Sequence, residues 1–132
     1  MSALKVAREW VATSTIAHVS FALFAMGGWA LFANRGHPPA VAMLAALVQG
    51  AVSAALTLCL KKFLEWFNAK LGGHAALVVP PLITAATILT ILITAHTLAG
   101  TPEIAATIAV PFTVSTSYAI LYNLKLWRGR RG

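Results

Sequence analysis

Charged residues divide this chain into long apolar stretches. No Asp, Glu, Lys or Arg occurs between Glu9 and Arg35, Arg35 and Lys61, Lys70 and Glu103, or Glu103 and Lys125. Each stretch can hold the roughly 20 apolar residues that cross about 30 Å of hydrocarbon. We therefore predict four membrane spans, near residues 10–33, 39–60, 80–98 and 104–124. The spans are expected to be helical because lipid offers no partner to backbone N–H and C=O groups.

The composition supports lipid as the solvent. Of the 132 residues, 59% are hydrophobic and 10% are charged, with a mean hydropathy of +0.81. A soluble domain of this size needs roughly a quarter of its residues charged to cover its surface. The net charge of +7 does not indicate nucleic acid, because the cations lie in short clusters and not along one folded face. We predict an all-α, polytopic membrane protein with one transmembrane domain, residues 1–132.

The basic residues predict how the spans are oriented. On one side of the four spans lie Lys5, Arg8, Lys61, Lys62, Lys70, Lys125, Arg128, Arg130 and Arg131, against Arg35 alone on the other. Under the positive-inside rule, this asymmetry places both termini in the cytoplasm. Trp10, Trp66 and Trp127 fall at the same predicted boundary, where Trp is enriched. We therefore expect a multi-pass protein of the bacterial inner (cytoplasmic) membrane, in contact with membrane lipids.

The connections between the spans indicate an internal repeat. An offset of 64 residues aligns Gly36 with Gly100 and Lys61 with Lys125. This match predicts two tandem helical hairpins, a form of parallel repeat that often builds transporters. Chance similarity between Ala-rich helices is the other explanation. Residues 61–71 are expected to continue the second span as an interfacial helix, with aromatic residues on the membrane and charged ones in water.

Polar residues inside the second and fourth spans are the candidates for a substrate path. Gln49 and Thr113 occupy equivalent positions in the repeat, as do Ser53 and Ser117. A polar seam between these spans would pass a polar substrate through the membrane. Alternatively, Gln49 hydrogen-bonds a neighbouring helix or protomer, because an unpaired amide is costly near the bilayer midplane. Pro111 is expected to kink the fourth helix, and nearby Ser and Thr residues can repair the break.

Small and hydroxylated residues predict helix packing. Ala42, Ala46, Gly50 and Ala54 recur at four-residue spacing in the second span, which permits close helix approach. The third span carries Thr84, Thr87, Thr90, Thr94 and Thr97. A membrane Thr can bond a carbonyl of its own helix, so we expect this face to pack against another helix and not to line a pore.

The ionisable residues offer little catalytic chemistry. His18 is the most deeply placed of them and is a functional candidate, although a neutral His bonded to a backbone or Ser partner is the alternative. His37, His74 and His96 are expected in loops or near the interface. No spacing typical of a metal site, paired carboxylate, phosphate loop or nucleophile elbow occurs. We therefore predict no enzyme, no metal and no cofactor.

The second and fourth spans end in aromatic and basic residues, KKFLEWF at 61–67 and YNLKLW at 122–127. These exits resemble those of the GtrA-like family of small four-span proteins. The family commonly shows Asn before such residues; Asn123 fits, whereas Cys59 stands at the other position. The resemblance implies movement of polyprenyl-phosphate-linked sugars across the membrane for cell-envelope glycosylation. It also implies that the lipid phosphate meets four cations: Lys61, Lys62, Lys125 and Arg128.

Those four cations also serve the positive-inside rule, so the sequence leaves three functions open. The first is a lipid-linked sugar translocase or its accessory, as a homodimer or with a partner membrane protein, because four short helices enclose little space. The second is a non-transporting membrane subunit or assembly factor of a larger complex. The third is a small oligomeric ion or proton pathway that uses His18.

Overall fold

The computed structural model describes residues 2–13 and 15–131, and the side chains of 10–13 and 131 lie outside the description. Within these ranges the chain forms five helices and no strand. They are α1 (Ala3–Thr13), α2 (Thr15–Ala33), α3 (Pro39–Lys70), α4 (Ala75–Ala99) and α5 (Ile104–Arg131). The four helices α2 to α5 are long and apolar enough to cross a membrane. Over the described residues, the structure therefore confirms an all-helical chain with four candidate membrane spans.

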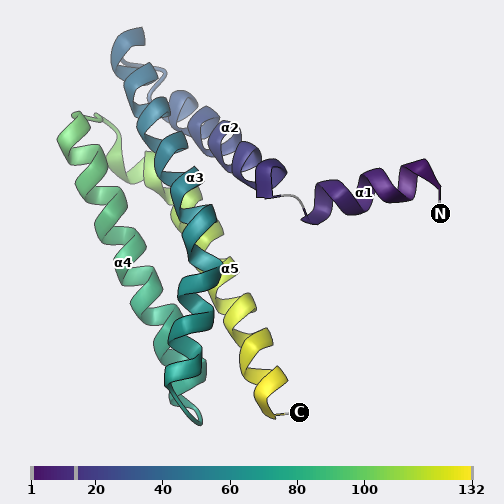
Figure 1. Ribbon diagram of the computed structural model, residues 1–132. Coiled ribbons are helices and arrows are strands. Elements are labelled where there is room, and N and C mark those ends of the chain that lie inside the picture. Colours follow the sequence, from purple (N-terminus) through teal and green to yellow (C-terminus); the bar gives the residue numbers. More distant parts are fainter. Residues whose placement is uncertain (1, 14, 132) are drawn as a thin grey trace.

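The first candidate span begins later than the predicted range of 10–33. The structure ends α1 at Thr13 and begins α2 at Thr15, and Ser14 lies outside the described residues. α1 projects away from the other helices (Figure 1). Trp10 belongs to α1, and its side chain, which we expected at the membrane boundary, lies outside the described part. At 1.5 Å per residue, the 19 residues of α2 still reach about 28 Å.

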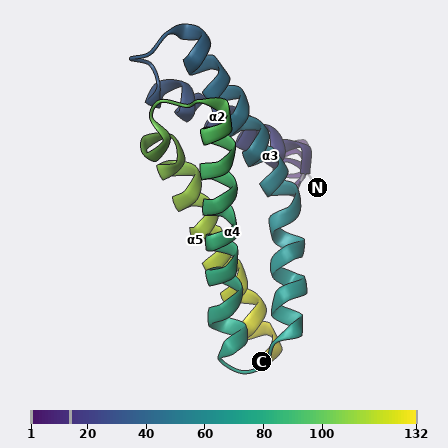
Figure 2. The ribbon, with the colours of Figure 1, turned by 90° about the vertical axis from the view of Figure 1, so that its left-hand side faces the viewer.

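The long helices run in alternating directions. α2 packs against α3 and α4 against α5, while α3 also contacts both α4 and α5. α4 and α5 accompany α3 along its length, whereas α2 leans against the part of α3 that begins at Pro39 (Figures 1 and 2). α3 continues unbroken to Lys70, so residues 61–70 of the predicted segment 61–71 extend the second span, and Leu71 is extended. Its place at the membrane interface stays a prediction.

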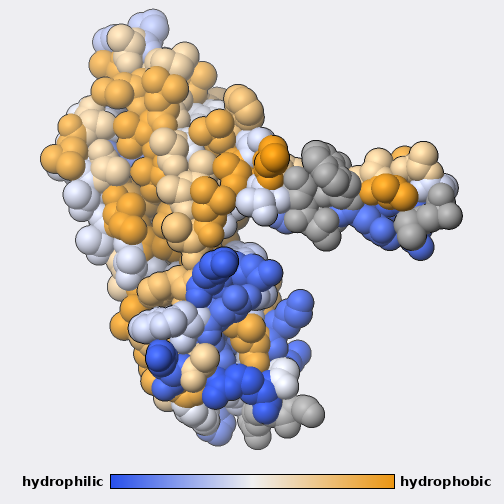
Figure 3. All heavy atoms as spheres, in the orientation of Figure 1, coloured by the Kyte–Doolittle hydropathy of each residue, from blue (hydrophilic) through white to orange (hydrophobic). Residues whose placement is uncertain are grey.

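The bundle has two distinct ends. The loops at 34–38 and 100–103 form one end, here called the distal end. The α3–α4 loop at 71–74 and the last turns of α5 form the other, here called the basic end. At the distal end, Gly100 terminates α4 with a φ of 70°, a left-handed conformation that favours Gly. In Figure 3, hydrophobic atoms cover the distal part of the visible face and hydrophilic atoms gather towards the basic end.

α2 and α3 approach each other through glycine. A Cβ added to Gly50 would lie 2.8 Å from the Leu23 carbonyl oxygen, and one added to Gly27 would lie 3.0 Å from that of Ala46. The small-residue spacing of the second span therefore permits close approach, as predicted. In lipid, where apolar burial adds little, such backbone contact drives association through van der Waals packing.

A second packing region joins α3, α4 and α5. Its buried apolar residues are Leu60, Leu64, Ile88, Leu92, Ile108 and Ala119. This region lies between the polar clusters described below. It packs the three helices against one another.

Candidate functional site

Two consecutive prolines in α4 leave carbonyl groups without helical donors. Pro80 and Pro81 lie inside the helix and have no backbone N–H. The carbonyls four residues earlier, those of Ala76 and Leu77, therefore receive no hydrogen bond from their own helix. Inside a membrane each unpaired carbonyl costs several kcal/mol, so donors must come from elsewhere.

Asn68 of α3 and Asn123 of α5 supply those donors. Asn123 Nδ2 donates to the carbonyls of Ala76 and Leu77, at 2.9 Å each. Asn68 Nδ2 donates to the Ala76 carbonyl at 2.9 Å and to Asn123 Oδ1 at 2.8 Å. Both side chains are buried, with 2% and 0% exposed. The pair thus uses all its N–H groups to join three helices at the basic end.

The last turns of α5 are fastened to the α3–α4 loop. Arg130 donates to the backbone carbonyl and Oδ1 of Asn68 and, at 2.8 Å, to the Leu71 carbonyl. Trp127 Nε1 donates to the Gly73 carbonyl at 2.9 Å. A guanidinium at this position satisfies the last carbonyls of α3 and opposes the negative end of its dipole.

A cavity of ≈ 290 Å³ opens beside this junction. It is lined by Gly73, His74, Ala76, Trp127 and Arg130. The cavity lies at the N-terminal end of α4, where the first backbone N–H groups have no helical acceptor and the dipole is positive. The guanidinium of Arg130 adds a fixed positive charge. The cavity is therefore suited electrostatically to an anionic group.

The four cations predicted to meet a lipid phosphate lie outside this cavity. Lys61, Lys62, Lys125 and Arg128 are all exposed, and none of them lines it. They are carried by the parts of α3 and α5 that run towards the basic end. Their contact with a lipid phosphate stays a prediction.

Gln49 and Ser53 lie together in the interior, and His96 is their partner. Gln49 Nε2 donates to Ser53 Oγ at 2.8 Å, and His96 Nε2 lies 2.8 Å from Gln49 Oε1. Because an amide oxygen can only accept, His96 carries its proton on Nε2, and its Nδ1 accepts from the Thr101 hydroxyl at 2.7 Å. Gln49 therefore bonds a neighbouring helix, as in the alternative considered above. His96, expected in a loop or near the interface, lies in the last turn of α4 with 0% exposed.

The fourth-span residues of the predicted seam face outwards. Thr113 and Ser117 are exposed, and the Thr113 hydroxyl donates to the Ala109 carbonyl of its own helix at 2.7 Å. Pro111 is buried within α5. The structure thus does not gather these residues around one path with Gln49, which is fully buried.

The remaining ionisable residues are dispersed. His18 is exposed on α2, near the start of that helix at Thr15. Tyr122 donates to Glu65 Oε1 at 2.5 Å, and its ring stacks on that of Tyr118 with 5.5 Å between centroids. Among the described residues, no group of three or more His, Cys, Asp or Glu side chains could hold a metal ion.

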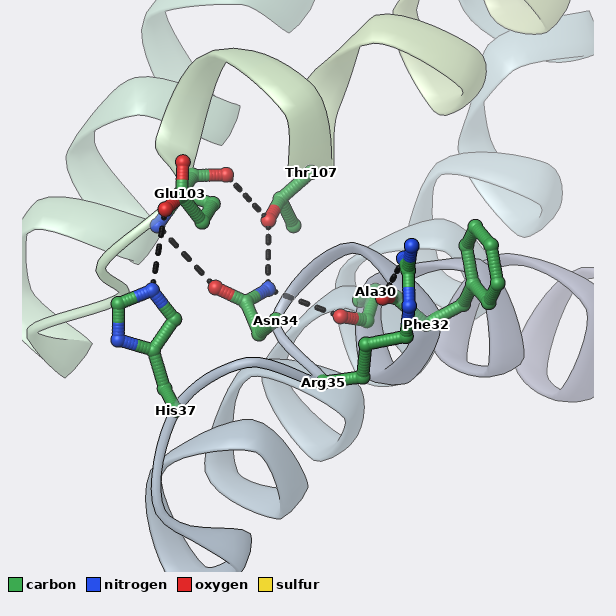
Figure 4. A network of polar contacts seen from close by, with 7 residues as sticks. All are labelled: Ala30, Phe32, Asn34, Arg35, His37, Glu103 and Thr107. Carbon is green, nitrogen blue, oxygen red and sulfur yellow. Dashed lines mark hydrogen bonds and ion pairs between the residues drawn. The ribbon is translucent and has the colours of Figure 1, made fainter.

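A separate polar cluster closes the distal end (Figure 4). Asn34 donates to the Thr107 hydroxyl at 2.7 Å and to the Ala30 carbonyl at 2.8 Å, and its Oδ1 accepts the Glu103 N–H at 3.1 Å. Thr107 in turn donates to the Glu103 carbonyl at 2.5 Å. His37 Nε2 lies 3.0 Å from Glu103 Oε1. The end of α2 is thus tied to the start of α5.

Sequence reasoning missed most of these buried polar residues. Asn34, Asn68, His96 and Thr107 were not assigned to a site, and neither was Asn123, although it belongs to the polar run of the fourth span and fits the family resemblance. The adjacent prolines of α4 were an available signal, because two missing N–H groups in an apolar span require two substitute donors.

Comparison with protein-family models, curated proteins and solved structures yields no match to this chain. The resemblance to the GtrA-like family therefore stays a prediction.

Proposed function

We propose that this protein binds polyprenyl-phosphate-linked sugars at its basic end and acts as a translocase, or the accessory of one, in cell-envelope glycosylation. In this proposal the four spans form two hairpins in the bacterial inner membrane, with both termini in the cytoplasm. The basic end then meets the cytoplasmic leaflet. The observation that carries the proposal is the ≈ 290 Å³ cavity lined by Arg130 at the N-terminal end of α4.

Electrostatics supports a phosphate at this end. The exposed cations Lys61, Lys62, Lys125 and Arg128 would raise the local concentration of anionic lipid, at about 1 kcal/mol per cation near an anionic surface. The cavity would then receive the phosphate, with Arg130 as a directional donor. The polyprenyl tail would remain in lipid against the exposed apolar side chains of α4 and α5.

The hydrogen bonds of the bundle interior favour binding of a lipid-linked sugar over its passage between the helices. Gln49 already bonds Ser53 and His96 with its amide groups, so a sugar could contact it only after these bonds break. Transport through the bundle would therefore require a second conformation. An accessory that presents the lipid-linked sugar to another protein requires none.

A binding measurement tests the proposal. The full chain in lipid nanodiscs is titrated with a polyprenyl-phosphate-linked hexose, and with the matching polyprenol that lacks the phosphate. Lys61→Gln with Lys62→Gln, and separately His74→Ala at the exposed cavity wall, are expected to weaken binding of the phosphate form. The double lysine change is expected to weaken it by about thirtyfold, at about 1 kcal/mol for each lost cation, and His74→Ala by about threefold to tenfold.

Arg35→Gln is the matched control, because it removes one positive charge at the distal end. A phosphate site at the basic end would be contradicted if wild type bound the polyprenol as tightly as the phosphate form. It would also be contradicted if Arg35→Gln weakened binding of the phosphate form as much as the basic-end variants do. If binding is retained, flipping of the same lipid in proteoliposomes separates the translocase from the accessory.

A second candidate function is a non-transporting subunit, and α1 favours it. This helix stands apart from the bundle, with Leu4 71% and Val6 50% exposed (Figure 1). A homodimer or a partner membrane protein would cover it. Removal of residues 2–13 should then abolish recovery of the partner in mild detergent and leave binding of the lipid-linked sugar intact.

A further inference from the structure

The first helix, α1, carries cationic and apolar side chains on different faces. Successive residues of a helix are rotated by about 100°. Lys5 and Arg8 therefore project from one side of the helix. Ala3, Leu4 and Ala7 project from the other side, and all five side chains are exposed, Leu4 to 71%. An exposed helix that separates charged and apolar side chains in this way is typical of a segment that lies along a lipid surface.

The bundle gives α1 little support. Among the helices of the described chain, α1 contacts α2 alone and projects away from the others (Figure 1). At its free end, the Lys5 N–H donates to the Ser2 hydroxyl at 3.2 Å, and Ser is among the best N-cap residues. Even with a cap, an isolated helix of 11 residues is marginal in water. A surface that covers the apolar face would therefore stabilise α1.

α1 leaves the bundle near the level at which the bundle surface changes from hydrophobic to hydrophilic. It ends at Thr13, and the candidate span α2 begins at Thr15. In Figure 3, the arm formed by α1 shows hydrophobic atoms towards the distal end and hydrophilic atoms towards the basic end. The visible face of the bundle has the same order of hydrophobic and hydrophilic atoms. α1 is therefore placed and rotated like a helix at the boundary between acyl chains and head groups.

One face of α1 is too small for a stable protein interface. Its 11 residues extend about 16 Å, and a helix with its side chains is about 10 Å across. The face therefore covers at most a few hundred Å², below the roughly 800 Å² per partner that stable complexes bury. A lipid surface requires no such area, because α2 holds α1 beside the bilayer at a high effective concentration. The second candidate function above assigns this face to a partner protein, and the measurements below separate the two.

We propose that α1 binds an anionic lipid surface, the leaflet that α2 enters. Leu4 and Ala7 then lie against the acyl chains, and the long side chains of Lys5 and Arg8 reach the lipid phosphates. Glu9 projects almost opposite to Ala7 and faces water, away from the phosphates. This contact uses neither the cavity at the basic end nor a lipid-linked sugar, so it is independent of the proposed function.

Spin labels on opposite faces of α1 measure its position in the full chain. Nitroxides are attached to Ala7→Cys and, separately, to Glu9→Cys, each in a Cys59→Ser background, in vesicles of equimolar phosphatidylcholine and phosphatidylglycerol. Molecular oxygen, which concentrates in lipid, should collide mainly with the label at position 7. A water-soluble nickel chelate should collide mainly with the label at position 9. Equal collision of the chelate with both labels would overturn the proposal. Shielding of position 7 from both reagents would also overturn it, because that result indicates a protein partner.

Removal of the two cations tests whether the lipid surface must be anionic. With the label at position 7, Lys5→Gln combined with Arg8→Gln should lower the ratio of lipid-bound to water-exposed α1 by about thirtyfold, about fivefold for each cation. In vesicles of phosphatidylcholine alone, the same variant should change the ratio little. Arg35→Gln is the matched control, because it removes a cation at the distal end. An equal fall in both kinds of vesicle, or a comparable fall with Arg35→Gln, would overturn the proposal.

Discussion

The helix pairs α2–α3 and α4–α5 are held together by different means. α2 and α3 meet at Gly27 and Gly50, where backbone touches backbone. α5 instead reaches α4 with a side chain, through Asn123 and the carbonyls that the prolines leave unpaired. The helices of both pairs are long and apolar enough to span a membrane, so hydropathy does not distinguish them.

The difference shows two ways in which helices can associate in lipid. In lipid, apolar burial contributes little to helix association, so packing and hydrogen bonds must provide the specificity. Glycine supplies packing by removing side chains. Proline creates a demand for hydrogen bonds, and the bonds that meet it come only from the correct neighbours. The first pair depends on shape, and the second depends on polar recognition.

The largest expected effect concerns Gly50. Gly50→Leu should lower the free energy of unfolding by at least about 3 kcal/mol, because the added side chain meets the Leu23 backbone, which cannot move aside. Titration from dodecyl maltoside into SDS, followed by circular dichroism, measures this. Gly28→Ala is the control in α2, since a Cβ there meets nothing within 4 Å. Equal stability of the two variants would contradict packing by close backbone approach.

Asn123 should come next. Asn123→Leu leaves the Leu77 carbonyl without a donor and one Asn68 N–H without its acceptor, and it should lower the free energy of unfolding by about 2–3 kcal/mol. The same change can be made in a background of Pro80→Ala and Pro81→Ala. In that background, residues 80 and 81 regain backbone N–H groups that can bond the carbonyls of Ala76 and Leu77. There, the same Asn123→Leu change should cost less than half as much. An undiminished cost would mean that Asn123 does not replace the missing amides.

The smallest of these effects concerns the contact between the two pairs. His96→Leu leaves the Gln49 amide oxygen and the Thr101 hydroxyl unpaired and should cost about 1–2 kcal/mol. The double variant, His96→Leu with Gln49→Leu, should lose less free energy of unfolding than the two single variants lose together. A ¹⁵N NMR spectrum of labelled His96 should show the proton on Nε2. Additive costs, or a proton on Nδ1, would contradict the hydrogen-bond assignment.

The sequence predicts the helices better than it predicts their contacts. Stretches without charge indicated four apolar helices, and small residues at four-residue spacing indicated the close approach at Gly50. Both inferences depend on local properties of one helix. The end of α1 at Thr13 and the start of α2 at Thr15 were not predicted, because the residues between Glu9 and His18 carry no charge that would mark a boundary.

The polar interior depends on properties that no single helix contains. Gln49 was correctly identified as a residue that needs a partner, but His96 could not be chosen without the rotation of α4 against α3. Thr113 looked equivalent to Gln49 in the repeat, yet it faces outwards and bonds its own helix. The rotation of each helix about its own axis decides between these outcomes, and packing between helices sets that rotation.

The prolines of α4 also impose an order in time on the growing chain. Asn68 is synthesised before α4 and can reach the Ala76 carbonyl as soon as that helix enters the membrane. The Leu77 carbonyl must wait for Asn123, which is made after α4 and arrives with α5. The Leu77 carbonyl of α4 therefore lacks a hydrogen-bond donor until α5 has joined the bundle.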